Sequence, residues 1–161
     1  MPLMEDIYEM ERRREVSILP FFYSSQFLNS VLTAGATITQ NIPIQSDSHF
    51  VVRYFTIATY TAGLVLSVAT APLLVQFFDS GAGRTLFDSP QPIQNVMGGV
   101  AAAAGQGSLP FILPEPWLVR AGGTIQVTLN NVGGATVVRA DVSCPGIKVF
   151  GFGGQLPQLG G

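Results

Sequence analysis

Hydrophobic side chains alternate with polar ones along several stretches of this chain, and this two-residue period constrains the fold more than any other feature. Residues 124–130 show it most clearly, because isoleucine, valine and leucine alternate there with threonine and glutamine. Successive side chains of an extended strand point to opposite faces, so the pattern predicts a strand with one buried and one solvated face. Residues 136–143 alternate again after a hairpin-type turn at residues 131–134.

Other segments predict further strands. Residues 49–60 (HFVVRYFTIATY) are rich in β-branched and aromatic side chains and apolar on both faces, which favours a strand inside a sandwich. The 18 glycines and 11 prolines favour short strands joined by turns. We expect further extended segments at residues 36–44, 64–68, 73–78, 92–97, 109–116 and 146–150. About eight strands at such spacings predict an all-β protein, a jelly roll or a related antiparallel β-sandwich.

The N-terminal residues differ from the body, and the chain divides into an arm at 1–25, a β-sandwich domain at 26–150 and a glycine-rich tail at 151–161. Apolar residues within 3–15 recur at helical spacing, and an apolar run opened by a proline follows, so the arm is expected to be extended or partly helical. We expect it to pack on another protein. The alternative is a charged tail or a helix added to the chain's own domain. The residues predicted to contact a partner are Leu3, Ile7, Met10, Arg12, Arg13, Arg14, Ile18, Leu19, Phe21 and Phe22.

Charge is scarce and unevenly distributed. Charged residues make up 11% of the chain, against roughly 25% in ordinary soluble domains. Eight of the eighteen lie within residues 5–15, and the remaining ten comprise five acidic and five basic residues. A nearly neutral body predicts that subunit contacts cover part of the surface. No basic stripe can neutralise successive phosphates, so we expect no direct nucleic-acid partner.

Neither a membrane nor a secretory pathway is expected. The longest apolar stretch, residues 64–78, is interrupted by polar residues and proline and falls short of the ~20 apolar residues that cross a bilayer. A charged N-terminus replaces the apolar region of a signal peptide. The single cysteine, Cys144, cannot form an internal disulfide, which agrees with a reducing compartment. These features predict maturation in a cytoplasm.

The residues that carry catalysis and metal binding are few. His49 is the only histidine, and its neighbours Asp47 and Ser48 would point to different faces of an extended chain, so a catalytic triad would need partners from elsewhere. A structural zinc site needs four cysteine or histidine ligands, and the chain has two such residues. Asp79 and Asp88 flank a glycine-containing loop, without the alternating oxygen ligands of calcium loops. We expect no enzymatic activity, no cofactor and no metal.

Five segments together resemble the small jelly-roll structural proteins of tailed bacteriophages, especially the cement or decoration proteins of the capsid. They cover most of residues 20–150, whereas residues 1–19 match no feature of that group. The segments are FFYSSQF (21–27), ITQNIPIQSDSHFVVRYFTIAT (38–59), LLVQFFDSGAGRTLFDSPQPI (73–93), FILPEPWLVRAGGTIQVTLNN (111–131) and VRADVSCPGIKVF (138–150).

The resemblance implies a virion structural protein without enzymatic residues. Such a protein would bind the outside of the capsid as a homo-oligomer, dimer or trimer, and stabilise contacts between subunits of the major capsid protein. It would assemble in the host cytoplasm. One alternative is a neck, tail or baseplate component of the virion. Another is a receptor-binding or carbohydrate-binding jelly roll, for which Trp117 beside Glu115 is the nearest candidate site unless Trp117 is a core residue.

Overall fold

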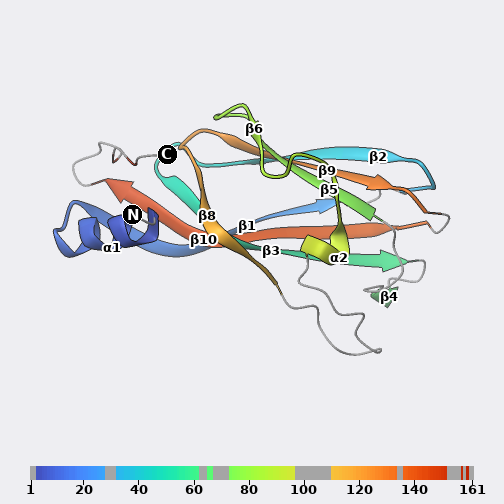
Figure 1. Cartoon of the computed structure of the whole chain (residues 1–161), viewed down its shortest axis with the longest axis horizontal. Helices are drawn as coiled ribbons and strands as arrows, with labels where there is room; N and C mark the ends of the chain where they lie inside the picture. The colour runs from blue at the N-terminus through green and yellow to red at the C-terminus, as the bar shows by residue number, and fades with distance from the viewer. Residues whose placement is uncertain are drawn as a thin grey trace.

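Two antiparallel sheets packed face to face form the body of the protein (Figure 1). The computed structural model describes residues 3–27, 32–61, 65–66, 73–96, 110–133, 136–151, 157 and 159. The first sheet contains β1 (Val16–Phe27), β10 (Arg139–Gly151), β3 (His49–Thr61), β4 (Val65–Leu66) and β8 (Phe111–Val119). The second contains β2 (Thr37–Pro43), β9 (Thr124–Asn131), β5 (Leu73–Asp79), β6 (Arg84–Thr85) and β7 (Gln91–Pro92). Two helices complete the described elements, α1 (Leu3–Arg12) and α2 (Ile93–Val96).

The strand pairs are nested, as in one long hairpin that has been rolled up. β1 pairs with β10, β2 with β9, β3 with β8, and β5 with β6 and β7. Along the chain, β1, β2, β3 and β5 lie alternately in the first and the second sheet. This alternation is the topology of a jelly roll. The predicted antiparallel β-sandwich is therefore confirmed. Representative opposite residues are Val16 and Gly151, Thr37 and Asn130, Phe50 and Val119, and Phe78 and Thr85.

Aromatic side chains bridge the two sheets in the core. Phe55 of β3 and Phe77 of β5 stack with their ring centroids 4.1 Å apart, and the Trp117 ring lies 6.2 Å from that of Phe55. Both phenylalanines are fully buried. Stacked aromatic pairs contribute about 0.5–1.5 kcal/mol beyond the burial of their area. The alternation predicted for residues 124–130 places every second side chain of β9 in this core.

The strand at residues 49–60 is apolar on both faces because each face of β3 is covered. Phe50 and Val52 point into the core between the sheets, whereas Val51 belongs to a second cluster. That cluster lies on the outer face of the first sheet beneath α1, and we call it the helix-covered cluster. Its buried members are Ile7, Val16, Val51, Leu118, Ile147 and Val149.

The N-terminal segment is part of the sandwich from residue 16 onward. All twelve residues of β1 pair with β10, so the boundary predicted at residue 25 falls inside a strand. The helical spacing predicted within residues 3–15 corresponds to α1. This helix is held against the first sheet by Ile7, which is fully buried.

The extended segment predicted at residues 92–97 is wrong, because Ile93–Val96 forms a single helical turn. Ile93 and Val96 are both buried in the core. Side chains three residues apart share one side of a helical turn but lie on opposite faces of a strand. Burying both in one core therefore favours the helical turn. Residues 98–108, predicted to form a loop or contact patch, lie outside the described residues.

Gly146 marks the closest approach between β10 and β3. A Cβ atom there would lie 2.0 Å from the backbone oxygen of Val51 and 3.0 Å from Phe50 Cζ. We expect Gly146→Ala to lower the free energy of unfolding by about 3 kcal/mol or more, because backbone atoms have to separate. Gly83→Ala is the control: Gly83 has φ +65° with no atom within 4 Å of the added methyl, so only about 1 kcal/mol of backbone strain is expected. Equal losses in denaturant unfolding would contradict this packing.

Candidate interaction surface

Four of the ten residues predicted to bind a partner pack within the chain itself. Ile7 is buried in the helix-covered cluster, and three partly buried residues pack against that cluster: Leu3, Met10 and Ile18. Placing these apolar side chains against the first sheet keeps them out of water without a second protein. Their arrangement fits the alternative in which the helix belongs to its own domain.

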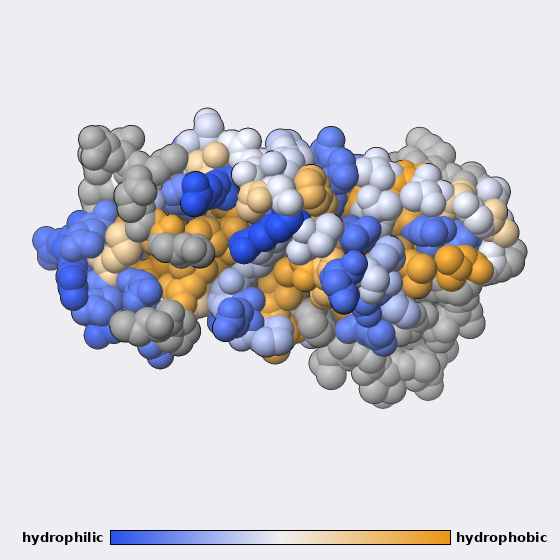
Figure 2. Space-filling model, turned by 45° about the horizontal axis from the view of Figure 1, so that its top comes forward, coloured by the Kyte–Doolittle hydropathy of each residue, from blue (hydrophilic) through white to orange (hydrophobic). Residues whose placement is uncertain are grey.

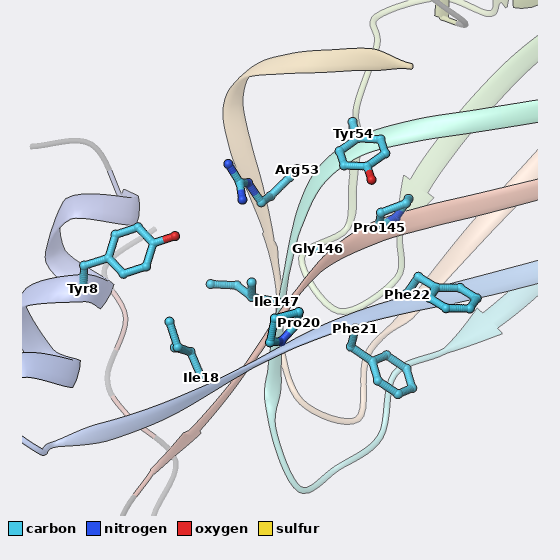
Figure 3. A pocket seen from close by; sticks show the side chains of 10 residues that line it. All are labelled: Tyr8, Ile18, Pro20, Phe21, Phe22, Arg53, Tyr54, Pro145, Gly146 and Ile147. Atoms are coloured by element: carbon cyan, nitrogen blue, oxygen red, sulfur yellow. The ribbon is translucent and has the colours of Figure 1, made fainter. Parts of the chain in front are cut away.

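The helix covers only part of the outer face of the first sheet, and a groove of about 470 Å³ lies beside it (Figure 3). Three strands and α1 contribute its walls. Phe22 is the most exposed aromatic residue of the groove, with 65% of its surface accessible. We call this feature the sheet groove. Its principal lining residues are Tyr8 of α1, Pro20 and Phe22 of β1, Arg53 and Tyr54 of β3, and Pro145 of β10.

Arg53 is the only charged residue among the described residues that line the sheet groove. Its side chain is exposed, and it makes no ion pair or hydrogen bond within the part of the chain that the structure describes. An unpaired guanidinium beside apolar walls is suited to binding a carboxylate, because two parallel N–H donors match two carboxylate oxygens.

The edge strand β8 forms a bulge beside this arginine. Val52 lies opposite Trp117 and Tyr54 opposite Ile112, so Arg53 alone faces residues 113–116 (LPEP). The two prolines lack the N–H that a continuous ladder needs, which explains the irregularity. Ile112 is 72% exposed. We call residues 112–116 the β8 bulge.

Phe21, also predicted to bind a partner, forms a cation–π contact with a buried lysine. Lys148 Nζ lies 4.4 Å from the centroid of the Phe21 ring and donates a hydrogen bond to Gln45 Oε1. Asp47 Oδ1 is 3.9 Å from the same nitrogen. The ring therefore helps to satisfy a buried charge, and the contact fixes the segment after β2 against β1. Leu19, the neighbouring predicted residue on β1, is exposed.

The three predicted arginines lie at the exposed C-terminal end of α1, which we call the arginine corner (Arg12, Arg13 and Arg14). Arg13 pairs with Glu9 one turn earlier. Arg14 adopts a left-handed backbone with φ 59°. Its N–H bonds to the Glu11 carbonyl, and the N–H of Glu15 bonds to the Met10 carbonyl. This is the Schellman ending of a helix, in which glycine usually occupies the position of Arg14. Figure 2 shows hydrophilic residues gathered at this end of the molecule.

The residues weighed for catalysis and metal binding have structural partners. Asp79 is buried, and its Oδ1 accepts hydrogen bonds from the backbone N–H groups of Gly81 and Ala82, which closes the turn after β5. Burial raises the pKa of the Cys144 thiol, which disfavours the reactive thiolate. Within the described ranges, no three His, Cys, Asp or Glu side chains are grouped so that they could hold a metal ion.

Trp117, the candidate for sugar recognition, is a core residue. Its side chain is 4% exposed and packs near Phe55 between the sheets. A sugar-binding tryptophan has to present its ring to solvent, so this side chain does not offer such a platform. Among the described residues, none of the helices combines the length and apolar character needed to span a bilayer.

No protein-family model matches this chain, and a search of curated proteins gives no match either.

His49 connects the body to the C-terminal tail. Nδ1 accepts a hydrogen bond from the Ala121 N–H, at 3.1 Å, and Nε2 lies 3.0 Å from the Pro157 carbonyl oxygen. A carbonyl can only accept, so Nε2 carries the hydrogen and the ring is neutral. Leu159, farther along the tail, packs against the helix-covered cluster. Nothing in the sequence of the tail indicates this attachment.

We expect Ile7→Ala to lower the free energy of unfolding by about 2–4 kcal/mol, because it leaves a cavity under α1. Glu11→Ala, at an exposed position of the same helix, is the matched control and is expected to change it by less than about 0.5 kcal/mol. Equilibrium unfolding in denaturant measures both. A negligible effect of Ile7→Ala would mean that the helix does not stabilise the sandwich.

A second prediction concerns pH. Burial lowers the pKa of His49 below its ordinary value of 6.5, the Pro157 hydrogen bond opposes this shift, and the positive charge of Arg120 adds to it. The unfolded chain therefore binds a proton more readily, so the contribution of neutral His49 to stability is complete above pH 6.5. It is lost as the pH falls through the folded pKa, with a slope of at most about 1.4 kcal/mol per pH unit.

The measurement is the free energy of unfolding between pH 7.5 and 5, compared with that of His49→Gln. The variant is expected to have a flatter profile over this interval. Identical profiles would show that His49 titrates alike in both states.

Proposed function

We propose that this protein is a non-enzymatic structural component of a phage virion, which binds the outside of the capsid and stabilises contacts between major capsid subunits. The arginine corner is the surface that meets the capsid protein. The jelly-roll topology, the charge-poor body and the resemblance of five segments to capsid decoration proteins support the proposal.

The main support for this proposal is the backbone conformation of Arg14. A left-handed backbone costs a residue with a side chain roughly 1–2 kcal/mol relative to glycine. Strain of this kind persists where the side chain serves another purpose. Arg12 and Arg14 are both exposed, so the corner offers two arginine side chains to an acidic partner.

The charge distribution adds to this argument. Ion pairs at the rim of an interface fix orientation and partner choice more than they add affinity. A body that carries few charges is instead suited to lie against neighbouring subunits in a symmetric shell, where contacts replace solvation. We therefore place the protein on the capsid surface, after assembly in the host cytoplasm.

A neck, tail or baseplate component would use the same surfaces at a lower copy number. Counting copies per particle separates these roles: a multiple of the number of capsid subunit joints supports the decoration role, and a few copies at one vertex support the alternative.

The proposal is tested with Arg14→Gly. We expect the free energy of unfolding of this variant to be about 1 kcal/mol higher, because the backbone strain is relieved. We also expect the variant to bind more weakly to capsids from the same virus that lack this protein. Loss of one partly exposed ion pair corresponds to an affinity reduced about two- to fivefold. Reversing both exposed arginines, in Arg12→Glu with Arg14→Glu, is expected to reduce the affinity at least tenfold.

Arg84→Glu serves as the matched control, because Arg84 is an exposed arginine of β6. It is expected to leave capsid binding unchanged, and raising the salt concentration is expected to weaken binding of the unmodified protein. Capsid binding that is insensitive to all these changes would rule out the arginine corner. No binding by the unmodified protein would reject the capsid role itself.

A further inference from the structure

The sheet groove and the β8 bulge adjoin at Arg53, which lines the groove and lies opposite residues 113–116. The groove offers apolar walls and the unpaired guanidinium of Arg53. The bulge offers Ile112, Pro114 and the carboxylate of Glu115, all exposed. Glu115, like Arg53, makes no ion pair within the described residues. The register of β3 and β8 places Arg53 opposite residues 113–116, the segment that contains Glu115.

We propose that this face is an interface between two copies of the protein. The β8 bulge of one copy lies in the sheet groove of the second, with Glu115 against the second copy's Arg53. The exposed side chains of Ile112 and Pro114 in the bulge cover the aromatic walls of the groove. Because groove and bulge are neighbours, the same contact forms twice about a two-fold axis.

Charge complementarity favours a second copy as the occupant. The body carries only five basic and five acidic residues, and one unpaired member of each kind lies on this face. A two-fold interface requires a patch that is complementary to itself, in which residue i meets residue j and j meets i. An arginine and a glutamate side by side, each next to exposed apolar groups, satisfy that requirement.

The contact is a docking of side chains and not an extension of the sheet. Pro114 and Pro116 remove two N–H donors from the outer strand, and proline protects sheet edges against added strands. The bulge also displaces the chain from the line of the ladder between Val52 and Tyr54. Exposed apolar surface at such an edge is therefore covered by packing into a concave surface.

Arg53 and Glu115 take no part in the arginine corner, so the dimer and the capsid contact are independent. A protein that dimerises without binding capsids would refute the proposed function alone. A monomer that binds capsids would refute this inference alone.

The test uses charge reversal of the full chain. Sedimentation of the unmodified protein is expected to show a monomer–dimer equilibrium. Arg53→Glu and Glu115→Arg, each alone, are expected to raise the dimer dissociation constant at least tenfold, because like charges then meet at both contacts. Arg84→Glu, an equal change of charge elsewhere, is expected to leave the constant unchanged. Thermal unfolding verifies that each variant is folded.

Mixing the two single variants distinguishes this contact from an ion pair within one chain. One variant carries two acidic groups at the contact and the other two basic groups, so a mixed dimer has both opposite-charge pairs. We expect the mixture to associate with an affinity within about threefold of the unmodified protein, and a chain with both changes to form homodimers again. Folded variants that stay monomeric when mixed would overturn the proposal, as would an unmodified protein that is monomeric at every concentration.

Discussion

Twelve residues of β1 lie against β10, and this pairing joins the first and last strands of the chain at one edge of the first sheet. β10 in turn pairs with β3, so the last strand connects β1 to the rest of that sheet. The first strand also reaches the second sheet, because the Ser25 hydroxyl bonds to Gln40 of β2. Without β1, the helix-covered cluster would lose Val16, and α1 would lose its direct connection along the chain to the first sheet.

The outer face of the first sheet explains how one small domain acquires distinct surfaces. A strand such as β3 that is apolar on both faces needs cover on each side, and the second sheet supplies only one cover. The ten-residue α1 is shorter than the face on which it lies, so part of the apolar surface beside it remains open as the sheet groove. The charges of the N-terminal segment are meanwhile held at the end of the molecule by the packing of Ile7.

Sequence pattern predicted most of the long strands, since β9 alternates strictly and the segments of β3 and β5 are almost continuously apolar. It did not identify β1, because Pro20 and the exposed Phe21 and Phe22 interrupt the alternation. Nor could it show whether the apolar side of α1 packs on this chain or on another protein, because both arrangements require the same helical spacing of apolar residues. The short turn at Ile93 was mistaken for a strand, since four residues carry too little pattern to separate the two states.

The proposed contact surfaces were even less accessible to sequence reasoning. Arg14 was noticed as part of a basic run, but its strained backbone is a property of the helix ending. Arg53 and Glu115 are far apart in the chain and become neighbours only through the irregular pairing of β3 with β8.

The nested pairing of the strands also has a consequence for biosynthesis. The first strand leaves the ribosome long before the last strand is made. Its apolar side chains therefore cannot pair with β10 until translation is almost complete, and the sandwich closes only then.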